Sequence, residues 1–319
     1  LSARQLIREM MAPNKLTEDD IGEYSGERKE VRPVTIATYQ IVITRRKGSF
    51  PHLALFDANN WGLIIYDEVH LLPAPVFRLT ADLQSRRRLG LTATLVREDR
   101  REGDVFTLIG PKRYDAPWRD LERQGWIAPA TCTEVRVALP DDQRLAAAVA
   151  EPDERYRIAV TSPAKLAVVD ALVARHQGEP TLVIGQYLDQ LAVIGERLGA
   201  PVITGRTRVT ERERLYDAFR DGDEPLLVVS KVANFSIDLP DAAVAIQVSG
   251  TFGSRQEEAQ RLGRILRPKA NGGQAHFYAV VARETVDQEY AAHRQRFLAE
   301  QGYAYDIVDA ADVLRGTAS

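Results

Sequence analysis

The chain has 319 residues, of which 45% are hydrophobic and 27% charged, and its 42 basic and 45 acidic side chains give a formal charge of −3. This composition predicts a globular protein of about two domains and argues against a disordered chain, a collagen or a coiled coil. The nearly balanced charge argues against a wholly basic surface for nucleic acids but allows a local basic groove.

Short apolar runs alternate with amphipathic segments along the chain. The apolar runs predict buried strands at residues 34–37, 62–66, 88–92, 181–185, 201–204, 226–230, 244–248 and 276–281. Helices with one apolar face are predicted at residues 164–175, 188–198, 211–219 and 284–298. Because apolar strands that alternate with helices are typical of parallel sheets covered on both faces, we predict an α/β fold with parallel sheets.

This alternation breaks near the middle of the chain. Two turn signals, Leu139-Pro-Asp-Asp142 and Glu151-Pro-Asp-Glu154, bracket a short helical pattern over residues 143–149. They predict a domain boundary between about residues 140 and 160. The organisation expected is a first domain over residues 1–140, a linker over 141–157 and a second domain over 158–319.

Two adjacent carboxylates, Asp67 and Glu68, follow the predicted strand 62–66 directly. Strand ends are where α/β sheets bind ligands, and nucleotide hydrolases use one such aspartate near Mg²⁺ and a second carboxylate near the attacking water. Taken alone, the pair is more often a solvated acidic turn, because short motifs arise frequently by chance.

The next predicted strand, 88–92, ends on Thr92, and Thr94 follows after one alanine. Hydroxyl groups at this position can hydrogen-bond the carboxylates at the neighbouring strand end and respond to their state. This second feature shifts the interpretation of Asp67 and Glu68 from a solvated turn toward a nucleotide site.

Two arginines in the second half, Arg264 and Arg267, lie three residues apart and share a face of a predicted helix, with Gln260 one turn before them. Arginines supplied by a second domain can stabilise a transferring phosphoryl group. The alternative is a surface ladder of salt bridges with Glu257 and Glu258.

The carboxylate pair, the two threonines and the arginine helix, in this order along the chain, resemble motifs II, III and VI of superfamily 2 helicases. The run Asp67-Glu-Val-His70 resembles the DEVH box of the XPB family of DNA-repair and transcription helicases, and Arg97-Glu98-Asp99 resembles the Arg-Glu-Asp motif of that family. The resemblance spans about residues 34–308. Further matching blocks lie at residues 109–114, 230–231, 235–240, 260–267 and 295–303.

The resemblance implies two RecA-like parallel-sheet lobes, the first incomplete at its N-terminus, with Mg²⁺ and ATP bound between them. It implies an ATP-dependent DNA helicase or translocase that moves 3′-to-5′. The DNA would be a single strand or a junction, and the protein partner a nuclease or a repair or transcription factor. The family's thumb-like insertion would fall at residues 141–157, where this chain is short.

Residue by residue, the resemblance implies that Asp67 binds Mg²⁺ and that Glu68 orients or activates water. The phosphates would be contacted by Gln260, Arg264 and Arg267. Hydrolysis would be coupled to movement by His70, Thr92, Thr94 and Asp238. The residues expected to contact nucleic acid are Thr38, Tyr39, Arg97, Glu98, Asp99, Thr204, Gly205, Arg206, Ser230 and Lys231.

The chain departs from the family pattern at one important place, because it contains no Gly-x-x-x-x-Gly-Lys-Ser/Thr loop for the phosphates. Ser2-Ala-Arg-Gln5 resembles the tail of the family's motif Ia, so we expect a piece of a longer protein. An inactive nucleic-acid-binding scaffold is one alternative, which the missing loop favours and the intact carboxylates and arginines oppose. A restriction translocase subunit is another, and residues 97–99 and 295–303 argue against it.

The cellular setting is predicted from what the sequence lacks. The single cysteine, Cys132, excludes an intramolecular disulfide and argues against a cysteine-based zinc site. Neither an apolar run of the ~20 residues that a membrane helix needs nor a signal-peptide layout at the first residues is present. We therefore expect a cytoplasmic protein that acts on the nucleoid.

Overall fold

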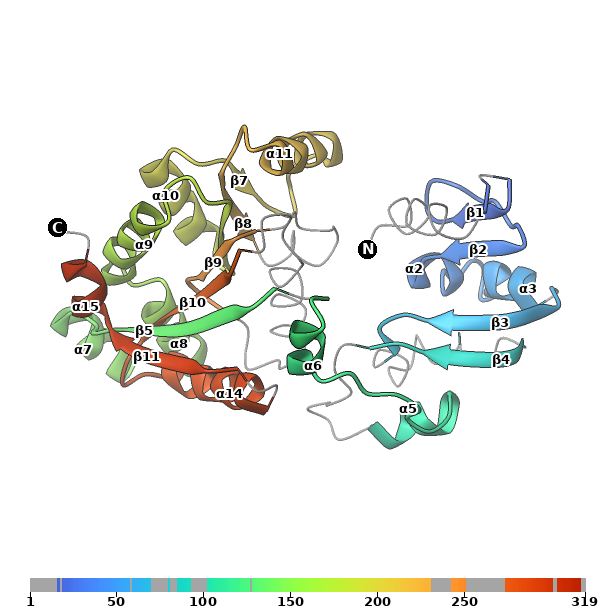
Figure 1. Ribbon diagram of the computed structural model, residues 1–319, viewed down its shortest axis with the longest axis horizontal. Coiled ribbons are helices and arrows are strands. Elements are labelled where there is room, and N and C mark those ends of the chain that lie inside the picture. Colours follow the sequence, from blue (N-terminus) through green and yellow to red (C-terminus); the bar gives the residue numbers. More distant parts are fainter. Residues whose placement is uncertain are drawn as a thin grey trace. The chain divides into compact units, whose positions relative to one another are not determined.

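The computed structural model describes residues 16–17, 19–57, 59–69, 80, 85–92, 102–126, 128–230, 242–250, 273–300 and 303–316. The chain divides into two compact units, Leu1–Asp115 and Ala116–Ser319 (Figure 1). This division comes earlier in the chain than the predicted boundary near residue 140. The reason is the strand β5 (Ala130–Val137), which pairs with two strands of the second unit and so belongs to its sheet.

The first unit contains two pairs of parallel strands. The strands are β1 (Ile21–Tyr24) with β2 (Val34–Ala37), and β3 (Trp61–Tyr66) with β4 (Ser85–Gly90). The helices described in this unit are α2 (Tyr39–Val42), α3 (Pro51–Asp57) and α5 (Glu102–Leu108). Two small apolar clusters hold these elements, one around Tyr24 and Phe56 and one around Tyr66, Val69 and Val105.

The second unit is built on a seven-stranded parallel sheet with the order β11-β5-β10-β9-β6-β8-β7. Besides β5, its strands are β6 (Thr181–Gly185), β7 (Val202–Ile203), β8 (Leu226–Ser230), β9 (Val244–Gln247), β10 (Ala275–Ala282) and β11 (Tyr305–Asp309). Its described helices are α6 (Trp118–Arg123), α7 (Asp141–Val149), α8 (Pro152–Val160), α9 (Ala164–Arg175), α10 (Leu188–Leu198), α11 (Val209–Asp221), α14 (Val286–Glu300) and α15 (Ala310–Arg315).

Helices cover both faces of this sheet, as Figure 1 shows. Successive residues of β6 alternate between the two layers, so that Leu182 and Ile184 pack with α11 and α14 while Val183 packs with α9, α10 and α15. Burial on both sides explains why the central strands read as continuous apolar runs in the sequence. The α/β class predicted from that pattern is confirmed.

The segment predicted as a linker, residues 141–157, forms α7 and most of α8 in the second unit. Tyr156 of α8 is only 1% exposed, and its ring meets the ring of Tyr290 of α14 edge-on at 5.1 Å. The turn signals at residues 139–142 and 151–154 therefore mark the starts of α7 and α8 rather than a boundary between units. Within the described ranges, no helix combines the length and the apolar character needed to cross a bilayer.

Candidate functional site

The carboxylate pair lies where the sequence predicts it, in a turn directly after β3. This acidic turn consists of Asp67, Glu68 and Val69, of which Asp67 is exposed and Glu68 half-buried. Strand β4 runs parallel to β3 with Gly90 opposite Tyr66, so Thr92 leaves the sheet at the same edge. The arrangement matches the expectation that the hydroxyl and the carboxylates leave neighbouring strand ends together.

The backbone of the acidic turn is held in an unusual conformation. Glu68 has a φ of 49°, in the left-handed region that is unfavourable for residues with a side chain. Its N–H donates to Oδ1 of Asp67 at 3.0 Å, and the N–H of Val69 donates to the carbonyl of Leu91 at 2.9 Å. Backbone strain that is over-determined in this way is frequent at functional sites.

Gly90 allows the close packing of the two strand ends. A β-carbon at this position would lie 2.7 Å from Cγ2 of Val69, well inside van der Waals contact. The N–H of Leu91, the next residue, donates to the carbonyl of Tyr66 at 2.9 Å. Glycine at position 90 thus lets the end of β4 pack directly against Val69 of the acidic turn.

Tyr39, which is predicted to contact DNA, also supports the acidic turn. Its hydroxyl donates to the carbonyl oxygen of Asp67 at 2.8 Å, and its ring packs beside Tyr66 and Val69. Burial raises the pKa of the Tyr39 hydroxyl well above its usual value, and the nearby carboxylate of Asp67 raises it further. The hydroxyl therefore stays protonated and remains a donor throughout the physiological pH range.

Removing this donor should loosen the turn. We expect Tyr39→Phe to lower the free energy of unfolding by about 1 kcal/mol, because one hydrogen bond is lost while the ring is kept. Hydrogen exchange should also become faster at the amides of Glu68 and Val69. The matched control is Tyr24→Phe, which removes a hydroxyl bonded to Nδ1 of His52 at 2.8 Å in the same unit. Equal exchange at Glu68 in both variants would contradict the supporting role of Tyr39.

The described candidates for nucleic-acid contact lie at the ends of elements. In the first unit Thr38 precedes α2, and it is half-buried. In the second unit Thr204, Gly205 and Arg206 form a turn after β7, in which the N–H of Arg206 donates to Oγ1 of Thr204 at 3.1 Å. Gly205 and Arg206 are exposed, whereas Ser230, the last residue of β8, is only 2% exposed. Of these candidates in the second unit, the turn of Thr204, Gly205 and Arg206 is therefore the part that a nucleic acid can reach.

The other predicted site residues lie outside the described residues. They are His70, Thr94, Arg97, Glu98, Asp99, Lys231, Asp238, Gln260, Arg264 and Arg267.

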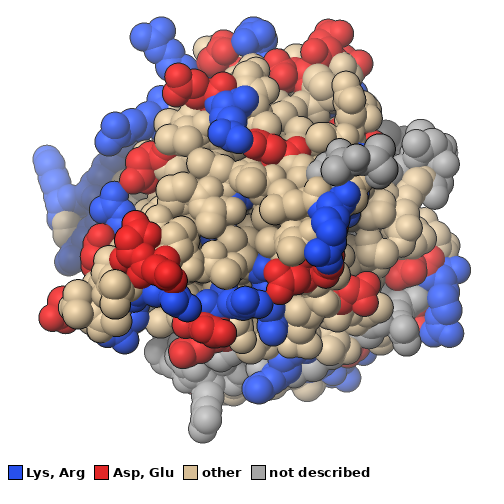
Figure 2. Space-filling model, turned by 90° about the vertical axis from the view of Figure 1, so that its left-hand side faces the viewer, with Lys and Arg blue, Asp and Glu red and all other residues tan. Residues whose placement is uncertain are grey.

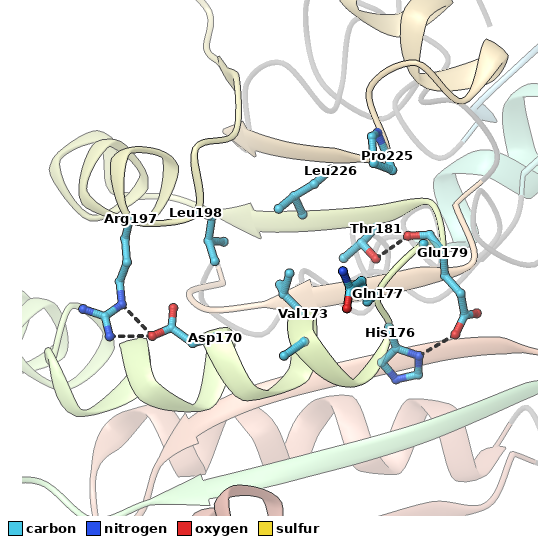
Figure 3. A pocket seen from close by; sticks show the side chains of 12 residues that line it. Asp170, Val173, His176, Gln177, Glu179, Thr181, Arg197, Leu198, Pro225 and Leu226 are labelled. Carbon is cyan, nitrogen blue, oxygen red and sulfur yellow. Dashed lines mark hydrogen bonds and ion pairs between the residues drawn. The ribbon is translucent and has the colours of Figure 1, made fainter. Parts of the chain in front are cut away.

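In the second unit, a cavity of about 620 Å³ opens at the end of the sheet where the parallel strands begin (Figure 3). It lies beside the first residues of β6 and β8, Thr181 and Leu226, and the last turns of α9 and α10. An ion pair between Arg197 and Asp170, with Nε 2.6 Å from Oδ2, lies at its wall. Because α/β sheets bind ligands at the carboxyl ends of their strands, this cavity is not the nucleotide site.

Figure 2 shows the side of the molecule on which α15 lies in Figure 1. Basic and acidic side chains are interspersed there. Alternating signs do not make the concentrated positive surface that phosphates attract. This side is therefore a poor candidate for the track of a nucleic acid.

The relationship to known proteins agrees with this geometry. Residues 121–317, more than half of the chain, match the family model "ERCC3/RAD25/XPB C-terminal helicase". The chain belongs to the XPB helicase family. Residues 3–97 match a second model, "Type III restriction enzyme, res subunit", which covers the part of the chain that holds the acidic turn.

Relatives named as XPB match the chain over nearly its whole length. The DNA 3'-5' helicase XPB of Kineococcus radiotolerans is 72% identical over 98% of this chain and 56% of the relative. The protein of the same name from Mycobacterium tuberculosis is 71% identical over 98% of this chain and 57% of the relative. A Schizosaccharomyces pombe relative, "General transcription and DNA repair factor IIH helicase/translocase subunit XPB", is 34% identical over 97% of this chain. The chain spans about half the length of the curated relatives it matches.

Solved helicase structures share the fold of the chain. Saccharomyces cerevisiae Dbp5 bound to RNA and ADP BeF3 aligns with a TM-score of 0.66 at 12% identity, covering 99% of this chain and 78% of Dbp5. The DUF1998 helicase MrfA bound to DNA and AMPPNP aligns with a TM-score of 0.62 at 15% identity, covering 95% of this chain and 43% of MrfA. At such low identity these likenesses establish the RecA-like α/β fold of this chain and no more.

Sequence reasoning missed buried polar residues of the second unit that lie near the carboxyl end of the sheet. Lys165 and Tyr156 are each 1% exposed, and their polar atoms bond to the backbone that follows β9. One signal was available in the sequence: Lys165 shares a helix face with Val168, Val169 and Leu172, all of them buried. A lysine on an apolar face indicates a buried partner, but the sequence does not say which.

Proposed function

We propose that this chain is the motor part of an ATP-dependent DNA helicase or translocase that moves 3′-to-5′. The observation that carries the proposal is the acidic turn: two carboxylates at the carboxyl end of a parallel strand, on a backbone fixed from both sides. In a member of the XPB family, whose bacterial relatives are named DNA 3'-5' helicases, this turn has the chemistry that ATP hydrolysis needs.

The donor groups of the acidic turn suit a magnesium nucleotide. Mg²⁺ prefers oxygen ligands and is commonly held by one or two carboxylates together with the substrate's phosphates. Asp67 offers an exposed carboxylate of this kind. When bound, the metal ion would neutralise charge on the phosphates, and Asp67 is the residue proposed to hold it.

Glu68 is the proposed general base. Its carboxylate would orient the attacking water and accept a proton from it, while the left-handed backbone fixes the direction of the side chain. Thr92, which leaves the neighbouring strand end, would respond to the state of the carboxylates and pass it on. His70, Thr94 and Asp238 are proposed to share in this coupling.

The second unit is proposed to supply the groups that complete phosphate recognition. Gln260, Arg264 and Arg267 would contact the phosphates and stabilise the charge that develops during transfer. Their sequence spacing supports this role, because arginines three residues apart on a helix lie on one face.

DNA is the proposed nucleic acid, held through its phosphates. The exposed turn of Thr204, Gly205 and Arg206 offers backbone N–H groups, a hydroxyl and a guanidinium, all of which bind phosphate. The remaining proposed contacts are Thr38, Tyr39, Arg97, Glu98, Asp99, Ser230 and Lys231. Because phosphate contacts dominate such binding, we propose that affinity for DNA falls with salt. A repair or transcription factor is the proposed protein partner, by likeness to relatives named as subunits of factor IIH.

Strand displacement by the full-length gene product tests the proposal. Duplexes that carry a 3′ or a 5′ single-stranded tail are incubated with ATP and Mg²⁺, and turnover is measured with and without each DNA. We expect DNA to stimulate hydrolysis and displacement to require the 3′ tail. DNA binding without turnover would favour the scaffold alternative. Turnover without displacement on either duplex would favour a translocase that does not separate strands.

A further inference from the structure

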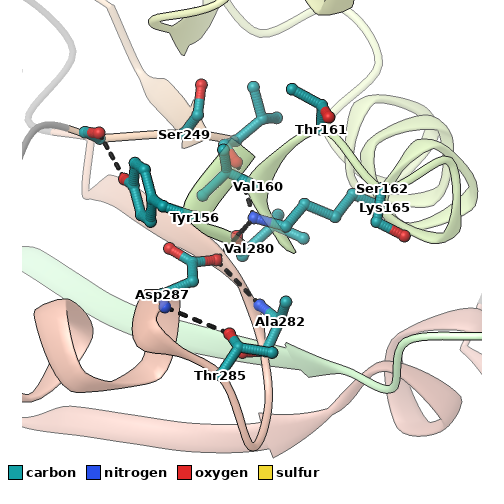
Figure 4. A network of polar contacts seen from close by, with 12 residues as sticks. Tyr156, Val160, Thr161, Ser162, Lys165, Ser249, Val280, Ala282, Thr285 and Asp287 are labelled. Carbon is teal, nitrogen blue, oxygen red and sulfur yellow. Dashed lines mark hydrogen bonds and ion pairs between the residues drawn. The ribbon is translucent and has the colours of Figure 1, made fainter. Parts of the chain in front are cut away.

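Two groups of charged side chains lie at opposite ends of the second sheet, and they differ in what they leave for a ligand. At the carboxyl end (Figure 4), the ammonium of Lys165 donates to the carbonyls of Val248 at 2.8 Å and Val280 at 2.7 Å, and to Oδ2 of Asp287 at 2.8 Å. An ammonium group has three donors, so these acceptors use all of them. Lys165 is therefore satisfied by the chain itself.

The cavity of Figure 3, at the end where the parallel strands begin, leaves carboxylate oxygens available. Nε and Nη2 of Arg197 both contact Oδ2 of Asp170, at 2.6 and 2.5 Å, and within the described ranges Oδ1 of Asp170 has no partner. Nδ1 of His176 lies 2.9 Å from Oε1 of Glu179, and in the same part of the chain no donor reaches Oε2. One oxygen of each carboxylate can therefore accept a hydrogen bond from a ligand.

The two carboxylates lie at opposite ends of the cavity, as Figure 3 shows. Asp170 lies in α9, and His176, which holds Glu179, follows the last residue of that helix. Six positions of a helix span about 9 Å along its axis, so a small ion cannot contact both carboxylates. Three apolar side chains line the wall between them: Val173, Leu198 and Leu226.

The electrostatics of the cavity favour a cation. The last turns of α9 and α10 both border it, and the carboxyl ends of helices carry partial negative charge. Among the described residues that line the cavity, Arg197 is the one lysine or arginine. The loop that leads into Pro225 adds Asp223 and Glu224, and the carbonyl of Pro225 accepts the N–H of Thr181 at 2.8 Å. A ligand that carries phosphate would be repelled here.

We propose that this cavity binds a linear polyamine, a flexible chain of methylene groups with an ammonium group at each end. One terminal ammonium donates to Oδ1 of Asp170 and the other to Oε2 of Glu179, while the methylene groups lie along the apolar wall. The volume of about 620 Å³ is ample for such a chain. This site lies away from the carboxyl ends of the strands and does not depend on the function proposed above.

Titration calorimetry on the full-length gene product tests the proposal. DNA and nucleotide are left out because both bind polyamines, and physiological salt screens weak attraction to the surface. The probes are spermidine, 1,8-diaminooctane and 1,3-diaminopropane, of which the last has the same end groups on a chain too short to reach both carboxylates. We expect spermidine and 1,8-diaminooctane to saturate one site. The short diamine should bind about tenfold more weakly, because one charge-assisted hydrogen bond is lost.

Variants of the cavity identify the site. Asp170→Asn and Glu179→Gln should each weaken spermidine about tenfold, and each should abolish the preference for the longer diamine. The matched control is Asp141→Asn, which also removes one negative charge but lies in α7, where the carboxylate pairs with Arg144 at 2.6 Å. Its affinity for spermidine should stay within about twofold of the wild type. Ala174→Trp places a bulky side chain in the lining without changing the charge, and it should also weaken binding at least about tenfold.

The outcomes separate a built site from general attraction of cations to an acidic surface. Equal affinity for the two diamines, an equal loss in Asp141→Asn, or no saturable binding of spermidine would each overturn the proposal. Circular dichroism shows whether each variant is folded. If Asp170→Asn does not fold because Arg197 loses its partner, Glu179→Gln and Ala174→Trp decide the question, and unchanged affinity in both would overturn the proposal.

Discussion

Glu68→Gln should lower DNA-stimulated ATP turnover at least about a hundredfold while leaving ATP binding intact. A positioned general base contributes roughly a hundred- to ten-thousandfold to a rate. Glutamine keeps the size and a hydrogen-bonding oxygen of Glu68 but cannot accept the proton. The backbone of the acidic turn should be preserved, because the bonds from Glu68 N–H and Val69 N–H do not involve the replaced group.

Steady-state turnover and a nucleotide-binding titration measure the two parts of this result. The control is Glu30→Gln, the same chemical change at an exposed residue of the first unit whose carboxylate lies 3.8 Å from Nε of Arg32. That variant should keep full turnover. Substantial turnover in Glu68→Gln would remove Glu68 from the role of base and leave it a structural residue of the turn.

The second large effect is expected at Lys165, on stability rather than on turnover. Burial lowers the pKa of its ammonium, and the carboxylate of Asp287 opposes that shift. Lys165→Met should cost about 3–5 kcal/mol of unfolding free energy, because it leaves Asp287 as an uncompensated buried charge and takes a donor from each of two carbonyls. Urea unfolding followed by circular dichroism measures the loss.

Two further variants identify the cause of that loss. Lys165→Met combined with Asp287→Leu should recover much of it, since replacing a buried ion pair by apolar side chains of similar volume is often nearly neutral. Arg197→Met, which breaks a partly exposed pair with Asp170, should cost no more than about 1 kcal/mol. A loss at Lys165 as small as that at Arg197 would contradict the three-bond geometry of the ammonium.

Strands with a continuous apolar run could be found from the sequence, and strands without such a run could not. The predicted strands at residues 181–185 and 226–230 coincide with β6 and β8, both buried in the middle of the sheet. β1 and β11 were missed because their sequences, Ile-Gly-Glu-Tyr and Tyr-Asp-Ile-Val-Asp, contain no continuous apolar run. The first pairs only with β2, and the second lies at the edge of its sheet.

β5 was missed for a different reason, because it carries charges inside the sheet. Glu134 is 1% exposed, and its carboxylate accepts from Nε of Arg136 at 2.9 Å and from the hydroxyl of Tyr305 at 2.9 Å. Tyr305 is 171 residues away in the sequence. A buried glutamate is stable only with such partners, and its distant partner becomes visible only when the chain is folded.

The sequence by itself determined the α/β class, the position of the acidic turn at the end of an apolar strand, and the family, because all three depend on local order: apolar runs, adjacent carboxylates and motif spacing. The tertiary structure alone decided that Tyr39 supports the acidic turn, that α7 and α8 belong to the second unit, and that Lys165 and Tyr156 hold the backbone after β9. Those facts depend on hydrogen bonds between residues 28 to 122 positions apart. Such partners are brought together by burial of apolar surface, which is non-directional, so the sequence around each polar group does not say which distant residue it will meet.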